Sequence, residues 1–226
     1  MIGSRFRSDE FEYRHFDING DLIDDYNQIY ERNLPKTKAE VAKFDWDCVM
    51  TVPENQWGYH KDWSLTYVKD AYDLIQLLVE ANSKGGNLVI NFGPDGKGNI
   101  RKEEAQLATQ IGDWMGKYSE AVYGAYSCSL EEQKWGYYTQ SENGDNMYLI
   151  VFNKPVNNKV RVKLPKAKEV ENVTIIYSAE FVETKNKGEV KYGGRDKEGF
   201  YYYDIILPAN YKNVTEPFVI KINIKS

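Results

Sequence analysis

Asn91 occupies a position at which α/β proteins often carry functional residues. It follows the apolar run 88–90, which predicts a buried strand, and Gly93 and Pro94 break the chain directly after it. The pair Gly85-Gly86 before the run predicts the left-handed end of a helix. Functional groups of α/β proteins lie at the C-terminal ends of their strands, so Asn91 is expected at the mouth of a site.

Two other kinds of chemistry find no support in the sequence. The glycine-rich stretch 93–98 lacks the Ser or Thr that a phosphate-binding loop carries after its lysine, because Gly98 follows Lys97. His15 and His60 are the only histidines, and neither has a cysteine or carboxylate neighbour at ligand spacing. The sequence therefore predicts no metal site, and it indicates no cofactor.

The composition narrows the class of protein. With 226 residues and 42% hydrophobic content, the chain can form one large or two smaller folded domains. A net charge of −5 without a basic block argues against nucleic acid, and the absence of a long apolar run argues against a membrane span. The 18 tyrosines and 5 tryptophans suit either a sugar-binding cleft or the surface of a β-sandwich.

Two helices and a few strands are expected in the first half of the chain. Strands are predicted at residues 46–51 and 87–91 and near residues 2–5, whereas residues 24–35 are expected to form a loop. An apolar face predicts a helix from Ser64, as its N-cap, to about residue 82. A second helix is predicted at residues 102–117.

From about residue 126 the pattern changes to short alternating runs separated by turns. Asn143-Gly144-Asp145 is a hairpin signal between two of these runs. The pattern predicts an antiparallel β-sandwich at 126–226, after an α/β part at 1–125. The expected strands are residues 135–139, 147–153, 159–164, 173–178, 189–192, 201–207 and 218–224.

Five blocks in the first half resemble consecutive blocks of the family 29 α-L-fucosidases. They begin at Trp46-Asp47-Cys48 and Trp57-Gly58-Tyr59, continue through residues 84–98 and Ile111-Gly112-Asp113-Trp114, and end at residues 120–124. The resemblance covers roughly residues 1–125. It implies the C-terminal part of a catalytic (β/α)8-type barrel, followed by the β-sandwich. Without further strands, however, the α/β part is too small to close such a barrel.

The resemblance also implies a reaction, namely the hydrolysis of terminal α-L-fucose with retention of configuration. That reaction uses two carboxyl groups, a nucleophile and an acid/base. In the family, the nucleophile is an Asp on a strand before the Ser-Arg block, which Ser4-Arg5 resembles. The nucleophile is therefore expected outside this chain, together with the N-terminal half of the barrel, and the chain alone is expected to be inactive.

Three residues receive roles from the resemblance. Glu31 matches the acid/base glutamate, Arg5 the arginine that contacts the sugar, and Trp57 an aromatic that packs on the methyl side of fucose. The alternatives are a solvated loop glutamate, a surface arginine near the terminus and a loop aromatic packed on the barrel rim. Asp47 stands where the family usually has Glu, and we interpret it as structural.

Two further hypotheses stay open. The first is a non-catalytic carbohydrate-binding or scaffolding module, with Trp57 and the Tyr-rich sandwich as its platform, and the second is a barrel glycosidase of another sugar specificity. The expected partners are a fucosylated glycan or fucoside and either the missing N-terminal half or a second copy of the chain. By resemblance alone, the protein is expected to be secreted, periplasmic or lysosomal.

Overall fold

The structure is a computed structural model that describes residues 18–19, 27–43, 45–188 and 199–225. Its contacts divide the chain into two compact units, Met1–Trp114 and Met115–Ser226. The division falls within helix α2 (Lys102–Tyr118), whose predicted extent differs from the observed one by a single residue. The domain boundary expected near residue 126 stays a prediction. No helix in the described ranges is long and apolar enough to cross a membrane.

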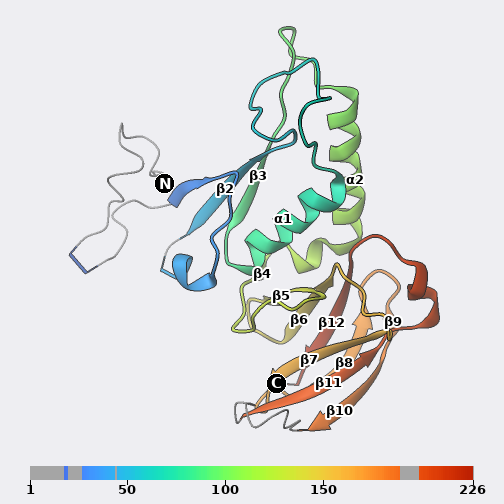
Figure 1. Cartoon of the computed structure of the whole chain (residues 1–226). Helices are drawn as coiled ribbons and strands as arrows, with labels where there is room; N and C mark the ends of the chain where they lie inside the picture. The colour runs from blue at the N-terminus through green and yellow to red at the C-terminus, as the bar shows by residue number, and fades with distance from the viewer. Residues whose placement is uncertain (1–17, 20–26, 44, 189–198, 226) are drawn as a thin grey trace. The chain divides into compact units, whose positions relative to one another are not determined.

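The first unit contains a sheet of three parallel strands (Figure 1). The predicted strands 46–51 and 87–91 are confirmed as β2 (Trp46–Thr51) and β3 (Asn87–Asn91). The expected loop is wrong over β1 (Asn27–Glu31), which pairs with β2. The pairing gives this polar segment its strand conformation, and the Tyr30 ring meets the Trp46 ring edge-on at 5.2 Å. The strand expected near residues 2–5 lies outside the described residues.

Helix α1 (Ala71–Ser83) begins seven residues later than its predicted N-cap. Asp70 caps it, because the Asp70 and Asp73 side chains each accept a hydrogen bond from the other residue's backbone N–H. Such a reciprocal cap satisfies two of the donors that a helix start leaves open. The Ser64 amide instead donates to the Asp62 carboxylate, and Leu65, which falls within the predicted helix, is 97% exposed.

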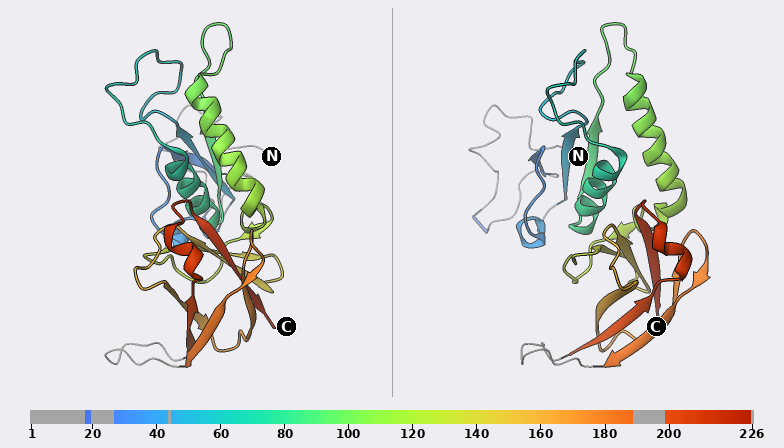
Figure 2. Two further views of the ribbon diagram at one scale, coloured as in Figure 1. Left: turned by 90° about the vertical axis from the view of Figure 1, so that its right-hand side faces the viewer. Right: turned by 45° about the vertical axis from the view of Figure 1, so that its right-hand side comes forward.

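The end of α1 follows the prediction. Gly85 has φ +83° in the left-handed region, and the amides of Gly85 and Gly86 donate to the carbonyls of Asn82 and Ala81, both at 2.9 Å. This turn leads the chain from α1 directly into β3, beside which the helix lies (Figures 1 and 2). Trp46 of β2 packs against Gly86, where a side chain would find no room.

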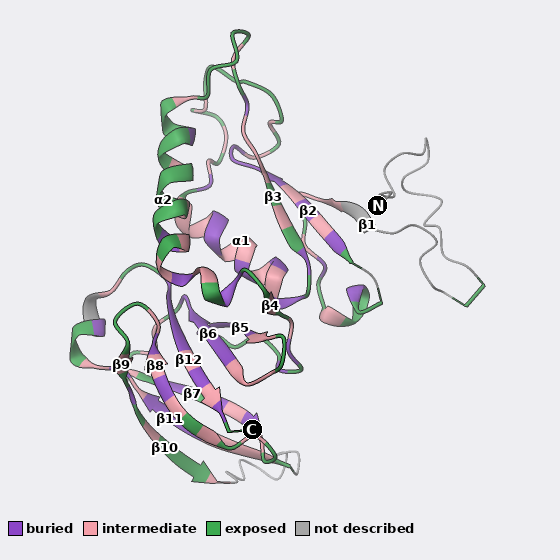
Figure 3. Cartoon of the chain, turned by 180° about the vertical axis from the view of Figure 1, so that it is seen from behind, coloured by how far each residue is buried: buried purple, intermediate pink, exposed green. Residues whose placement is uncertain are grey.

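The core of the first unit gathers around β2 rather than β3. Trp46, Cys48 and Met50 alternate into a buried cluster with Val41 and Ala81. In β3, no residue is fully buried, and Val89 is 47% exposed. Figure 3 shows the contrast between the buried stretches of β2 and the partly exposed β3. The described residues therefore do not supply the two-sided cover that the apolar β3 sequence predicts.

The second unit consists of antiparallel strands in two sheets. One sheet has the order β10-β11-β7, and the other has the order β4-β5-β6-β12-β8-β9. The strands are β4 (Ala125–Tyr126), β5 (Gly136–Ser141), β6 (Asn146–Val151), β7 (Lys159–Pro165), β8 (Val170–Ile175), β9 (Glu180–Phe181), β10 (Glu183–Gly188), β11 (Phe200–Ile206) and β12 (Phe218–Ile224).

Most strands expected here are present. The predicted hairpin joins β5 to β6, with Gly144 at φ +73°. The strand expected at 189–192 lies outside the described residues, and β10 precedes it. Trp135 connects the sheets, because its indole N–H donates to the carbonyl of Arg161 in β7 at 3.2 Å. The predicted combination of an α/β part with an all-β part is thus confirmed.

Candidate active site

The three parallel strands bring their last residues to one edge of the sheet. Glu31 ends β1, Thr51 ends β2 and Asn91 ends β3, and Thr51 and Asn91 are direct register partners. This is the edge at which parallel α/β sheets carry their sites. Two of the residues that the sequence singled out, Glu31 and Asn91, therefore lie along the same edge.

Arg32 holds the end of β1 in an unusual backbone conformation. It has φ +57°, in the left-handed region that non-glycine residues seldom occupy, and its amide donates to the Val49 carbonyl at 2.9 Å. Its Nε lies 3.7 Å from Oε1 of Glu31. The side chains of Arg32 and Glu31 are 35% and 30% exposed. The Glu31 carboxyl group is thus accessible to a ligand while an arginine steadies it.

The same arginine connects Glu31 to the aromatic loop. Its guanidinium carbon lies 5.8 Å from the centroid of the Trp57 ring, and its Nη1 donates to Oδ1 of Asn55. The Asn91 amide nitrogen donates to the Trp57 carbonyl at 2.7 Å. Trp57 itself is 36% exposed. Glu31 and Trp57, predicted separately, are thus neighbours of one arginine, and the end of β3 fixes the backbone of Trp57.

Gly93 lies close to the backbone of this loop. A Cβ atom on Gly93 would lie 2.7 Å from the carbonyl of Gly58 and 2.9 Å from the amide of Tyr59. The Gly93 amide donates at 3.2 Å to Oε1 of Glu104, a residue of α2 that is only 1% exposed. Only a glycine allows the loop to approach the β3–α2 connection this closely.

Arg101 holds the far end of the aromatic loop. Its guanidinium stacks 4.0 Å from the centroid of the Trp63 ring, and its Nη1 donates to the carbonyls of His60 and Lys61 at 2.8 and 3.2 Å. The sequence carries no signal for this role, because Arg101 lies 40 residues or more from both carbonyls.

Several buried polar atoms at the end of β2, in the aromatic loop and in α2 have no hydrogen-bond partner among the described residues. They are Oγ1 of Thr51, Oε1 of Gln56, Nε1 of Trp63 and Oε2 of Glu104. Buried polar groups are nearly always paired in folded proteins.

The remaining sequence candidates contribute less. Arg5 and His15 lie outside the described residues. Nδ1 of His60 lies 2.6 Å from the Asp62 carbonyl, and no group of possible metal ligands occurs in the described part of the chain. The glycine-rich loop turns around Asp95, whose carboxylate accepts backbone hydrogen bonds from Asn99 and Lys97 that lower its pKa.

Comparison with known proteins identifies relatives. The family model described as "Alpha-L-fucosidase" matches residues 4–120. Over 138 residues, the chain is 27% identical to an alpha-L-fucosidase of Branchiostoma floridae, covering 60% of this chain and 30% of that protein. Over 136 residues, it is 25% identical to the tissue alpha-L-fucosidase of Rattus norvegicus, covering 58% and 29%.

Solved structures extend the likeness to both units. A GH29 alpha-L-fucosidase of Bacteroides thetaiotaomicron, trapped as a covalent intermediate with 2-fluoro-fucosyl fluoride in a Glu-to-Gln mutant, matches with a TM-score of 0.84 and 42% identity. The match covers 100% of this chain and 49% of that one. The Thermotoga maritima alpha-fucosidase in complex with fucose shares the fold, with a TM-score of 0.66 and 21% identity.

The matches cover only part of each relative. The chain spans about half the length of the solved relatives and less than a third of the curated ones. The family match nevertheless covers just over half of this chain and includes β1, β2, β3 and the loop that carries Trp57. The chain therefore belongs to the glycoside hydrolase family 29 α-L-fucosidases.

Proposed function

We propose that this chain supplies the acid/base part of a retaining α-L-fucosidase site, with Glu31 as the acid/base and Trp57 beside the sugar. The observation that carries the proposal is the position of Arg32 between them at the C-terminal edge of the parallel sheet. A carboxyl group and an exposed aromatic ring held by one arginine are suited to a sugar, whose ring has both hydroxyl groups and an apolar face.

The proposed reaction has two steps. In the first, Glu31 donates a proton to the glycosidic oxygen while a second carboxylate attacks the anomeric carbon, and the bond to the leaving group breaks. In the second, Glu31 accepts a proton from water as the water displaces the enzyme carboxylate. A retaining site holds its two carboxyl groups about 5–5.5 Å apart. The ion pair with Arg32 would help to fix the Glu31 side chain at such a distance.

Trp57 and Arg5 are proposed as sugar-binding residues. The exposed Trp57 ring would pack against the C5-methyl side of fucose, which is the apolar side of that sugar. Arg5 would offer its forked donors to a ring hydroxyl group and a carboxylate together. Arg5 lies outside the described residues, so its role rests on the family resemblance alone.

The second carboxylate is proposed to come from polypeptide beyond this chain. The relatives are about twice as long, and the partly exposed Val89 in β3 is the kind of apolar surface that the rest of a (β/α)8 barrel would cover. A second copy of the chain is the alternative cover. The second unit is proposed as the β-sandwich domain that follows the barrel, and a secreted, periplasmic or lysosomal location stays a prediction.

The first test is an assay of the 226-residue chain on 4-nitrophenyl α-L-fucoside. We expect no turnover above the rate in buffer, because one of the two carboxylates is proposed to lie elsewhere. Turnover comparable to that of an intact relative would contradict this. The complementary test joins the chain to the half of the Bacteroides thetaiotaomicron enzyme that it does not cover, and we expect this chimera to be active.

The chimera also tests Glu31 itself. The Glu31→Gln variant should hydrolyse natural fucosides, whose leaving groups need protonation, about 10²–10⁴-fold more slowly. Azide attacks without general-base assistance, so added azide should restore the second step on an aryl fucoside. Glu54→Gln is the control, because Glu54 pairs with Lys69 rather than with Arg32. Equal losses in both variants would refute the assignment.

A non-catalytic carbohydrate-binding module is the second candidate, and the exposed Trp57 is the observation that favours it. It predicts that the chain binds L-fucose without turnover and loses binding on Trp57→Ala. Tyr59→Ala is the matched control, since Tyr59 is 46% exposed in the same loop. An active chimera that depends on Glu31 would decide in favour of the enzyme.

A further inference from the structure

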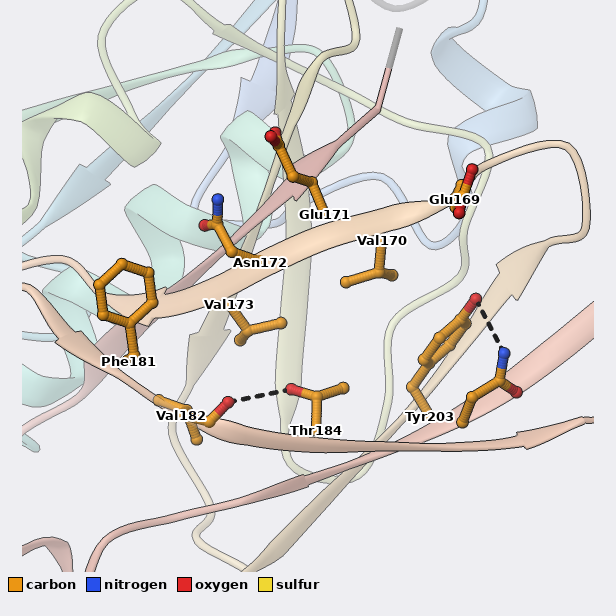
Figure 4. A pocket seen from close by; sticks show the side chains of 10 residues that line it. Glu169, Val170, Glu171, Asn172, Val173, Phe181, Val182, Thr184 and Tyr203 are labelled. Atoms are coloured by element: carbon orange, nitrogen blue, oxygen red, sulfur yellow. Dashed lines mark hydrogen bonds between the residues drawn. The ribbon is translucent and has the colours of Figure 1, made fainter.

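A second candidate site lies within the antiparallel unit. A cavity of about 380 Å³ opens between β8 and β9 of one sheet and β10 and β11 of the other; we call it the β8–β11 pocket (Figure 4). Its volume is within the range of small-molecule pockets. Its lining residues are Glu169, Val170, Glu171, Asn172, Val173, Phe181, Val182, Thr184, Asn186 and Tyr203.

The pocket combines an apolar floor with an exposed aromatic rim. Val173, Val182 and Tyr203 are buried. Figure 4 shows the Val170, Val173 and Tyr203 side chains between the strands, with Phe181 at one end. Phe181 is 74% exposed, although it is a large apolar residue at the mouth of a pocket. A ring in this position offers a flat apolar face to a ligand.

Tyr203, Asn186 and Thr184 supply neutral donors and acceptors to the pocket. The Tyr203 hydroxyl accepts from Nδ2 of Asn186 at 3.5 Å, and burial raises the pKa of Tyr203, so the hydroxyl keeps its proton to donate. The Thr184 hydroxyl donates to the Val182 carbonyl at 3.2 Å, which leaves its lone pairs as acceptors. Such groups complement the hydroxyl groups of a ligand.

Charge further restricts the ligand. The charged residues among those lining the pocket are Glu169, whose carboxylate lies 3.5 Å from Nζ of Lys225, and Glu171; none of the lining residues is a lysine or arginine. A phosphate or carboxylate would therefore meet the like charge of Glu171. A neutral ligand with many hydroxyl groups and one apolar face could pack against Phe181. Its hydroxyl groups could form hydrogen bonds with Tyr203 and Thr184 and with the carboxylates.

We propose that the β8–β11 pocket is a second saccharide-binding site, which holds a neutral sugar residue against Phe181. The proposal rests on the pocket alone and does not require Glu31 to be catalytic. Its function would be to retain a glycan on the protein independently of hydrolysis. Because Phe181 is largely exposed, its replacement is not expected to disturb the fold.

The test titrates the full 226-residue chain with two probes by calorimetry. The probes are 2′-fucosyllactose, which is neutral, and 3′-sialyllactose, which is anionic. We expect the neutral probe to bind, and Phe181→Ala to weaken that binding about tenfold, as for the loss of one ring stack. The control Tyr123→Ala, an equally exposed aromatic outside the pocket, should leave it unchanged, and the titration is repeated in a Trp57→Ala background so that the proposed active site does not contribute.

A second variant separates the polar contribution. Thr184→Val keeps the shape of the side chain but removes its hydroxyl group, and it too should weaken binding of the neutral probe. Thermal unfolding of each variant confirms that it is folded. Three results would overturn the proposal: no binding of the neutral probe, equally tight binding of the anionic probe, or binding that Trp57→Ala abolishes and Phe181→Ala leaves unchanged. The last result would assign the sugar to the proposed active site instead.

Discussion

Gly86 offers the sharpest test of the packing around β2 in the first unit. A Cβ atom at this position would lie 2.2 Å from Cε2 and 2.3 Å from Cζ2 of Trp46. Trp46 is 1% exposed, donates its indole N–H to the Lys84 carbonyl at 3.4 Å and packs edge-on against Tyr30. Gly86 is not among the residues with positive φ, so a substitution acts through space rather than backbone strain.

The cost of Gly86→Ala follows from those distances. Carbon atoms in contact are normally about 3.5–4.0 Å apart, so the ring or the turn must move by more than about 1 Å. Overpacking of this kind typically costs about 1–3 kcal/mol. We expect a value of about 3 kcal/mol, since moving the ring also disturbs Tyr30 and the Lys84 hydrogen bond. At about 2–4 °C per kcal/mol, the midpoint of thermal unfolding should fall by about 6–12 °C.

Gly112→Ala is the matched control. Gly112 lies within α2, and an added Cβ would meet no atom within 4 Å. Gly86→Ala and Gly112→Ala restrict the unfolded chain equally. Gly112→Ala also improves helix propensity, so it should stabilise the protein by about 1 kcal/mol. Unfolding in urea, followed by circular dichroism, measures both variants.

A double-mutant cycle isolates the clash itself. Trp46→Phe shrinks the ring, so Gly86→Ala should cost less in that background than in the wild type. A free energy of unfolding for Gly86→Ala within about 0.5 kcal/mol of the wild type would refute the predicted clash. Absence of coupling between positions 46 and 86 in the cycle would refute it as well.

Two further predictions concern charges. Arg161 forms a bidentate pair with the buried Asp204 at 2.7 and 3.0 Å, which lowers the Asp204 pKa below its usual 3.8. The pair therefore stabilises the fold above about pH 4, and this stabilisation is lost as the pH falls through the lowered pKa. In an acid titration, the difference in free energy of unfolding between the wild type and Asp204→Asn should disappear below pH 4. Asp70→Ala removes the α1 cap and should cost about 1 kcal/mol in urea unfolding, whereas Asp113→Ala, in the exposed interior of α2, should cost less.

The sequence predicts elements well where a local pattern determines them. The alternating or apolar runs of β2, β3 and β12 identify those strands, and the glycine pair identifies the end of α1. β1 was missed because its polar start, Asn27-Gln28, has no strand pattern and its conformation depends on pairing with β2. The start of α1 was misplaced because Ser64 and Asp70 are both acceptable caps, and only Asp70 has the reciprocal partner Asp73.

The candidate site was only partly predictable for a related reason. Glu31 and Trp57 came from the resemblance of short blocks, which specify residue types but not contacts. The role of Arg32 depends on Asn55, 23 residues away, and that of Asn91 on Trp57, 34 residues away. Such pairings arise only when strands and loops assemble, so no local pattern encodes them.

The position of Trp57 relative to Glu31 is therefore a property of three segments and not of the aromatic loop itself. Arg32, directly after β1, contacts the Trp57 ring, Asn91 of β3 holds the Trp57 carbonyl, and Gly93 allows the adjacent Gly58 to approach the β3–α2 connection. Two of these three contacts involve backbone atoms, and they would persist if the indole were replaced. A substitution in the β3–α2 connection would thus displace the aromatic loop. It would alter the proposed sugar site although Glu31 and Trp57 are themselves unchanged.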